Sequence, residues 1–75
     1  MSESKFCLVT GATGYIGGRL VNQLLNAGHR VRVMARFPDR LRDLPWYDKV
    51  EVIQADALDP VSMRSALQDI DVAYY

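Results

Sequence analysis

The chain has 75 residues, of which 49% are hydrophobic, and its formal net charge at pH 7 is zero. This length suffices for one small domain, and the neutral charge gives no reason to expect a general affinity for nucleic acid or an anionic membrane. A single cysteine, Cys7, excludes an internal disulfide, no Cys/His cluster has metal-ligand spacing, and no apolar run approaches the roughly 18–20 residues of a membrane span.

The first feature along the chain is an apolar strand that runs directly into closely spaced glycines. Phe6–Thr10 is a continuous apolar run of the kind expected in a central parallel strand, and Gly11, Gly14 and Gly17 follow it. Gly11 permits a tight turn, Gly14 lets the backbone approach a pyrophosphate, and Gly17 lets the next helix pack closely on the strand. Unpaired N–H groups at the start of that helix favour an anion, so this segment is predicted to bind phosphate.

The rest of the chain alternates between helices and strands. A helix is predicted from the spacing of Ile16, Leu20, Leu24 and Ala27, and Gly28 should end it as a left-handed cap. Three further strands are predicted at residues 31–35, 50–54 and 71–75. A short helix is predicted at residues 38–44, stopped by Pro45. Another helix is capped by Asp59 and has an apolar face of Met63, Ala66, Leu67 and Ile70.

This βαβαβαβ order predicts an α/β fold, namely a Rossmann-type doubly wound parallel sheet with strand order 3-2-1-4. A doubly wound sheet needs strands on both sides of its switch point, and this chain stops within the fourth strand. We therefore expect residues 1–75 to be the N-terminal, incomplete part of a single domain in a longer protein. The alternative is a small natural domain that dimerises to cover its open edge.

The string VTGATGYIGGRLVNQLLNAGHRVRVMAR resembles the N-terminus of the short-chain dehydrogenase/reductase superfamily, especially its extended and atypical branches, which carry TGATGxIG. QADALD, at residues 54–59, resembles the family's GDxxD segment after the third strand. The resemblance extends over residues 5–75 and implies a domain that binds NAD(P). A glycine motif alone is a weak signal, but here it lies between the expected strand and helix, with two further segments at the expected distances.

The end of the second strand predicts NADP(H) rather than NAD(H). NAD-preferring members place an Asp or Glu there for the ribose 2′-OH, whereas this chain has Ala35 followed by Arg36. A guanidinium can bind a phosphate through two hydrogen bonds and stack on adenine, and Arg40 lies one helical turn further along. The alternative is that Arg36 and Arg40 are solvated surface charges that pair with Asp39 or Asp43, and for Arg40 this alternative is favoured.

The resemblance assigns Asp56 to the adenine amino group and the backbone N–H of Ala57 to the adenine ring. A capping role for Asp56 is the alternative, but Asp59 already fills that role. Within the glycine loop, small Ala12 and Thr13 leave room for the diphosphate.

Tyr15 and Ile16 can donate their backbone N–H groups to the same diphosphate. Tyr15 to Arg19 superficially matches the family's catalytic YxxxK, but an arginine cannot tune a tyrosine as the lysine does. A P-loop is disfavoured because it would need Lys and Ser/Thr after its glycines. S-adenosylmethionine and FAD are disfavoured because their sites usually place an acid after the second strand. Cys7, His29 and Trp46 are predicted to be structural.

The resemblance implies an oxidoreductase that acts on a small carbonyl, hydroxyl or sugar-type substrate, or an epimerase or dehydratase. The family's catalytic Ser/Thr, Tyr and Lys come from the fifth strand and the following helix, so no catalytic residue is assigned here and the segment alone should be inactive. A non-catalytic regulatory protein that senses dinucleotide is the alternative. The first five residues lack the pattern of a signal peptide, so a cytoplasmic protein is expected, and an oligomer is compatible with the sequence.

Overall fold

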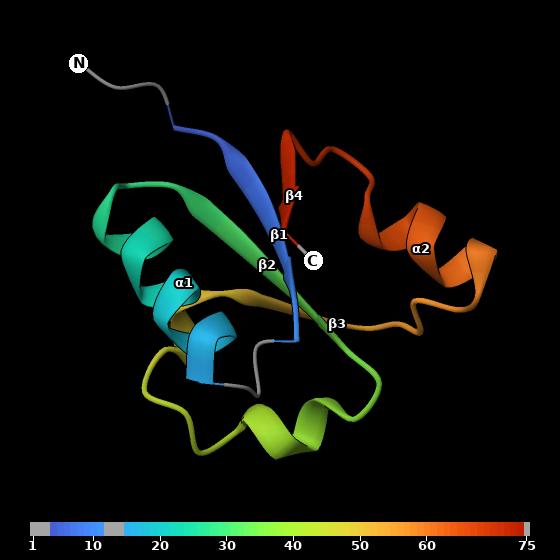
Figure 1. Cartoon of the computed structure of the whole chain (residues 1–75), viewed down its shortest axis with the longest axis horizontal. Helices are drawn as coiled ribbons and strands as arrows, with labels where there is room; N and C mark the ends of the chain where they lie inside the picture. The colour runs from blue at the N-terminus through green and yellow to red at the C-terminus, as the bar shows by residue number, and fades with distance from the viewer. Residues whose placement is uncertain (1–3, 12–14, 75) are drawn as a thin grey trace.

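The computed structural model describes residues 4–11 and 15–74. In chain order the elements are β1 (Phe6–Thr10), α1 (Tyr15–Asn26), β2 (Arg30–Ala35), the 3-10 helices η1 (Pro38–Leu41) and η2 (Tyr47–Lys49), β3 (Glu51–Gln54), α2 (Pro60–Ala66) and β4 (Val72–Tyr74). The strands form one parallel sheet in the order β3-β2-β1-β4, which confirms the predicted order (Figure 1). The order changes direction between β1 and β4, so the carboxyl end of β1 lies at the switch point where such sheets bind ligands.

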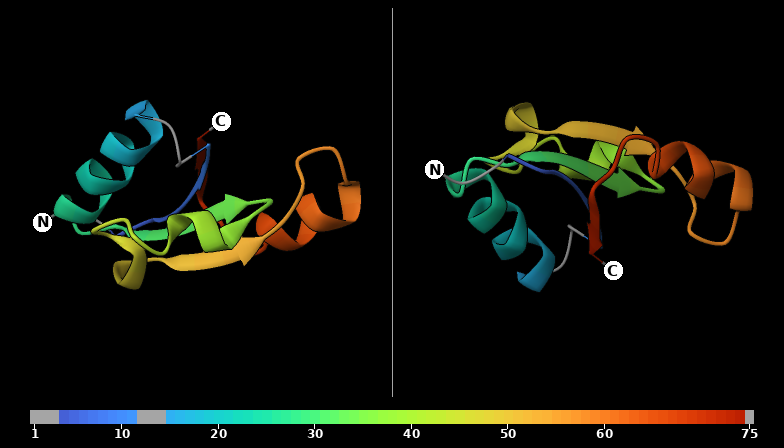
Figure 2. Two further views of the ribbon diagram at one scale, coloured as in Figure 1. Left: turned by 90° about the horizontal axis from the view of Figure 1, so that it is seen from below. Right: turned by 90° about the horizontal axis from the view of Figure 1, so that it is seen from above.

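The sheet separates two apolar clusters, because successive side chains of a strand point to opposite faces. Figure 2 shows α1 on one side of the sheet and α2 on the other. The α1 side holds the larger cluster, whose buried members are Cys7, Val9, Val21, Leu24, Val31, Val33, Leu41 and Trp46. The α2 side holds a smaller cluster of Leu8, Met34, Ala55 and Ala66. Both faces of the central strands are therefore covered, as the continuous apolar run in β1 predicts.

The helix ends follow the predicted capping pattern. Gly28 has φ +87°, and the N–H groups of Gly28 and His29 donate to the carbonyls of Leu25 and Leu24 at 3.0 and 3.1 Å. This pair of hydrogen bonds is a Schellman motif, which glycine favours because it carries no Cβ. At the start of α2, Oδ1 of Asp59 accepts a hydrogen bond from the Val61 N–H at 3.1 Å.

Two elements differ from the prediction. The helix expected at residues 38–44 is the shorter 3-10 helix η1, which ends at Leu41. The N–H groups of Arg40, Arg42 and Leu44 each donate to the carbonyl three residues earlier, and a helix with this 3-10 pattern rarely extends beyond about four residues. The predicted apolar face of α2 is also wrong in part, because the helix ends at Ala66 and Leu67 is 38% exposed.

Strand boundaries also differ slightly from the prediction, since β2, expected at residues 31–35, is Arg30–Ala35. The third strand, expected at residues 50–54, is Glu51–Gln54. The fourth, expected at residues 71–75, is Val72–Tyr74, and Tyr75 lies outside the described residues.

The three residues predicted to be structural are either buried in the core or hydrogen-bonded to the backbone. Trp46 and Cys7 are buried in the α1-side cluster, and burial, together with the Asp71 carboxylate, raises the pKa of the Cys7 thiol. Nδ1 of His29 accepts a hydrogen bond from the backbone N–H of Lys5 at 3.1 Å, which connects the start of β1 to the loop before β2.

Within the described part of the chain, no helix is long and apolar enough to cross a bilayer.

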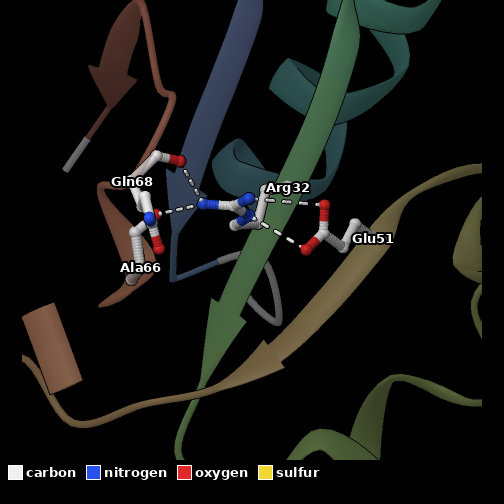
Figure 3. Close-up of polar contacts among 4 residues, drawn as sticks. All are labelled: Arg32, Glu51, Ala66 and Gln68. Carbon is white, nitrogen blue, oxygen red and sulfur yellow. Dashed lines mark hydrogen bonds and ion pairs between the residues drawn. The ribbon is translucent and has the colours of Figure 1, made fainter. Parts of the chain in front are cut away.

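Arg32 is a buried charge on the α2 side of the sheet that the sequence analysis did not single out. Its Nη1 donates to the carbonyl oxygens of Ala66 and Gln68, each at 2.8 Å, and its Nη2 lies 3.5 Å from Oε2 of Glu51 (Figure 3). Nε lies 3.2 Å from Oε1 of Glu51 as an ion pair without hydrogen-bond geometry. The guanidinium thus joins β2 to β3 and binds carbonyls at the end of α2, which lack helical partners.

Candidate functional site

A cavity of about 440 Å³ lies at the carboxyl ends of β1, β2 and β3. Its lining comes from three segments that are far apart in sequence, namely residues 10–11, residues 34–37 with Arg40, and residues 55–58. Parallel strands end at the same edge of a sheet, so the fold brings the three segments together.

The cavity brings together many of the residues that the sequence singled out. Gly11, Arg36, Arg40, Asp56 and Ala57 all line it. The predicted residues Ala12, Thr13 and Gly14 lie outside the described residues.

Tyr15, Ile16 and Gly17 form the first turn of α1. The structure describes the backbone of Tyr15 and Ile16 but not their side chains. Their proposed contribution is a backbone N–H group in each case, so it depends on the helix start rather than on the side chain.

Gly11 connects β1 to the segment that leads into α1. Its φ is +68°, a left-handed conformation that residues with a Cβ rarely adopt. A Cβ built at Gly11 would meet no atom of the described residues within 4 Å. The positive φ therefore accounts for glycine at this position.

The cationic side of the cavity comes from Arg36 and Arg40, which follow β2. The carbonyl of Arg36 accepts a hydrogen bond from Nε2 of Gln54 at 3.2 Å, and the N–H of Arg40 donates to the carbonyl of Phe37 at 3.1 Å. Both backbones are thus held while both side chains are exposed.

The local acidic groups leave these two guanidinium groups available. Asp39, one of the partners considered for them, pairs instead with Arg42 at 3.2 Å. Among the residues that the structure describes, neither Arg36 nor Arg40 forms an ion pair. Two uncompensated positive charges at a cavity edge favour an anionic ligand.

Asp56 provides the acidic group of the cavity lining. Its Oδ1 accepts a hydrogen bond from the Leu58 N–H at 2.9 Å, and its carbonyl accepts one from the Asp59 N–H at 3.0 Å. Its own turn therefore orients the Asp56 side chain, and Oδ2 makes no hydrogen bond within residues 4–11 and 15–74. Asp59 caps α2, so the two carboxylates have separate structural roles.

Sequence reasoning missed the apolar rim of this cavity. Phe37 is 55% exposed and Leu58 is 87% exposed, and both residues line the cavity. Phe37 also lies between the two cations: its ring centroid is 5.6 Å from Cζ of Arg36 and 4.9 Å from Cζ of Arg40. Its position directly after Arg36, at the end of a strand, was the sequence signal that could have identified Phe37 as part of the cavity.

Comparison with known proteins finds similarity to NAD(P)H-binding proteins and to a short-chain dehydrogenase. A model of a family described as NAD(P)H-binding matches residues 11–75. The solved structure of a short-chain dehydrogenase from Streptomyces avermitilis superposes with a TM-score of 0.77 at 29% sequence identity, covering 95% of this chain and 30% of that one.

Among curated relatives, a 3 beta-hydroxysteroid dehydrogenase/Delta 5→4-isomerase of Mycobacterium tuberculosis is 38% identical over 68 residues, which is 91% of this chain and 18% of the relative. A dihydroflavonol 4-reductase of Zea mays is 36% identical over 74 residues, which is 89% of this chain and 21% of the relative. The chain therefore spans about a fifth of the length of these relatives.

Proposed function

This chain belongs to the family of NAD(P)H-binding domains, of the short-chain dehydrogenase/reductase type, and we propose that it binds NADP(H) in preference to NAD(H). The observation that carries the preference is the end of β2. Ala35 stands where an acid would bind a ribose 2′-OH, and Arg36 follows it at the cavity with no acidic partner among the described residues. A 2′-phosphate at the end of β2 would meet the Arg36 guanidinium, while the Asp56 carboxylate belongs to the β3 side of the cavity.

The cavity geometry supports a division of the cofactor among the three strand ends. The turn after β1, where Gly11 has φ +68° and α1 begins a few residues later, would hold the diphosphate. Backbone N–H groups and the helix dipole favour negative charge at that point. Gly11 suits this position because it adopts the left-handed turn and adds no side chain at the place proposed for the diphosphate.

The segment that follows β3 would hold the adenine. Asp56 is oriented by its own turn and keeps Oδ2 for the adenine amino group, while Ala57 is exposed beside it. The apolar lining of Met34 and Leu58 offers contact area for the ring. The Asp56 carboxylate, the Ala57 backbone and the apolar lining together fit a purine, which presents an apolar face and a polar edge.

For the whole protein, we propose an oxidoreductase that acts on a small carbonyl, hydroxyl or sugar-type substrate. Relatives named as dehydrogenase or reductase favour this activity over the dinucleotide-sensing alternative. The bound nicotinamide supplies the hydride chemistry. This chain holds the adenosine end and the phosphates, so its residues act by binding and orienting the cofactor.

The test is Arg36→Ala in the full-length protein, with Kd measured for NADPH and NADH by fluorescence titration. A charge-assisted hydrogen bond contributes about 1.5–3 kcal/mol, so the affinity for NADPH should fall about tenfold to a hundredfold while that for NADH stays within about twofold. Arg42→Ala is the matched control, because Arg42 is exposed but pairs with Asp39. An equal loss for both cofactors would remove Arg36 from the 2′-phosphate site.

A further inference from the structure

Phe37 is a large apolar side chain that is 55% exposed at the edge of the cavity. It lies between the end of β2 and the start of η1, with φ −126° and ψ 79°. Leaving a phenyl ring this open forgoes most of the stabilisation that burial would give. Packing alone therefore does not account for a phenylalanine at this position.

The ring has a specific relation to the two guanidinium groups. Its centroid lies within the range of cation–π attraction from Arg36, at 5.6 Å, and from Arg40, at 4.9 Å. The hydrogen bond from the Arg40 N–H to the Phe37 carbonyl sets their spacing, because residues three apart in a 3-10 helix lie on one side. One ring thus contacts one cation from the strand end and one from η1.

Bringing two positive charges to one ring is unfavourable unless something compensates their repulsion. Asp39 is the nearest acid in sequence, and it pairs with Arg42. Among the described residues the two cations therefore lack an acidic partner, although both face a cavity. An anionic group in this cavity would supply the compensation.

We propose that Phe37 is a positioning residue, which restrains Arg36 and Arg40 so that both contact one phosphate monoester. This inference rests on the proposed function and extends it, because it assigns Arg40 to the same phosphate and gives Phe37 a role in cofactor selectivity. Long arginine side chains lose rotamer freedom when they bind, and a ring that already restrains them lowers that loss. Phe37 itself carries no charge and acts through its two neighbours.

The experiment compares two mononucleotides that differ by one phosphate. Adenosine 2′,5′-bisphosphate and 5′-AMP are titrated calorimetrically into the full-length protein and its Phe37→Leu and Phe37→Tyr variants. Leucine keeps an apolar side chain but removes the aromatic face, whereas tyrosine keeps the face. For Phe37→Leu we expect the affinity for the bisphosphate to fall about fivefold and that for 5′-AMP to stay unchanged, with Phe37→Tyr close to wild type.

A double-mutant cycle provides a second measurement that a merely structural role would not move. In an Arg36→Ala/Arg40→Ala background, Phe37→Leu should cause no further loss of bisphosphate affinity, because the groups it positions are gone. A further fivefold loss there would overturn the inference. So would an equal loss for both nucleotides, which indicates stacking on adenine, or no loss for either.

The same titrations separate this inference from the proposed function. If the wild-type protein binds both mononucleotides equally well, the proposed preference for a 2′-phosphate fails, and the role of Phe37 fails with it. If the wild-type protein prefers the bisphosphate and Phe37→Leu keeps the full preference, only the inference about Phe37 fails.

Discussion

Replacing Arg32 with methionine tests which contacts of this buried cation stabilise the fold. Nη1 of Arg32 donates to the carbonyls of Ala66 and Gln68, each at 2.8 Å. A hydrogen bond to a charged group contributes about 1.5–3 kcal/mol, but the Gln68 carbonyl is only partly buried and can return to water. Methionine keeps an apolar stem against the sheet. We therefore expect Arg32→Met to lower the free energy of unfolding by about 2–3 kcal/mol.

Glu51→Gln is the matched comparison. The Glu51 side chain is 50% exposed, so its ion pair with Arg32 is screened by water and contributes about 1 kcal/mol or less. Glutamine also keeps an oxygen that can accept from the guanidinium. The expected order is therefore a large loss for Arg32→Met and a small one for Glu51→Gln.

Urea denaturation of the full-length protein gives both free energies, and hydrogen exchange of the Gln68 and Ile70 amides reports the local effect. These amides donate to the carbonyls of Ser65 and Leu67, within the segment that Arg32 holds. Arg32→Met should accelerate their exchange more than Glu51→Gln does. If Glu51→Gln proved as costly as Arg32→Met, the ion pair and not the carbonyl contacts would be the main contribution.

Two further changes have expected outcomes. Gly28→Ala should lower the free energy of unfolding by about 1–2 kcal/mol in urea, because φ at Gly28 is +87°, whereas Gly28→Asn should cost less. Burial, helped by Asp71, raises the pKa of the Cys7 thiol, so the folded chain keeps a proton that the unfolded chain loses. Stability should then fall as the pH rises above the ordinary thiol pKa, and an unchanged fall in Cys7→Ala would exclude the thiol as its cause.

The strand order was predictable from sequence because local patterns and one chirality rule determine it. The apolar run at Phe6–Thr10 and the capping signals at Gly28 and Asp59 locate the elements, and all three features are confirmed. Right-handed crossovers then leave few ways to arrange parallel strands. The helix expected at residues 38–44 is shorter because its backbone forms 3-10 hydrogen bonds, and the two prolines that mark the ends of the segment do not distinguish a 3-10 helix from an α-helix.

The sequence predicts those residues of the candidate site that follow the end of a strand. Arg36 and Asp56 each follow a strand, and parallel strands bring such positions to one edge. Whether they bind a cofactor stays a prediction. Arg32 could not be predicted in the same way, since its carbonyl partners Ala66 and Gln68 are 34 and 36 residues away and carry no side-chain signal.

The central place of β1 has a consequence for the nascent chain. Lys5 and His29, which are hydrogen-bonded where β1 meets β2, are 24 residues apart, whereas Phe6 and Asp71, which are hydrogen-bonded where β1 meets β4, are 65 apart. The first three strands can therefore associate while the ribosome still holds the fourth. Until β4 emerges, β1 presents an open apolar edge that is prone to pairing with other chains, and this interval is when a chaperone would protect it most.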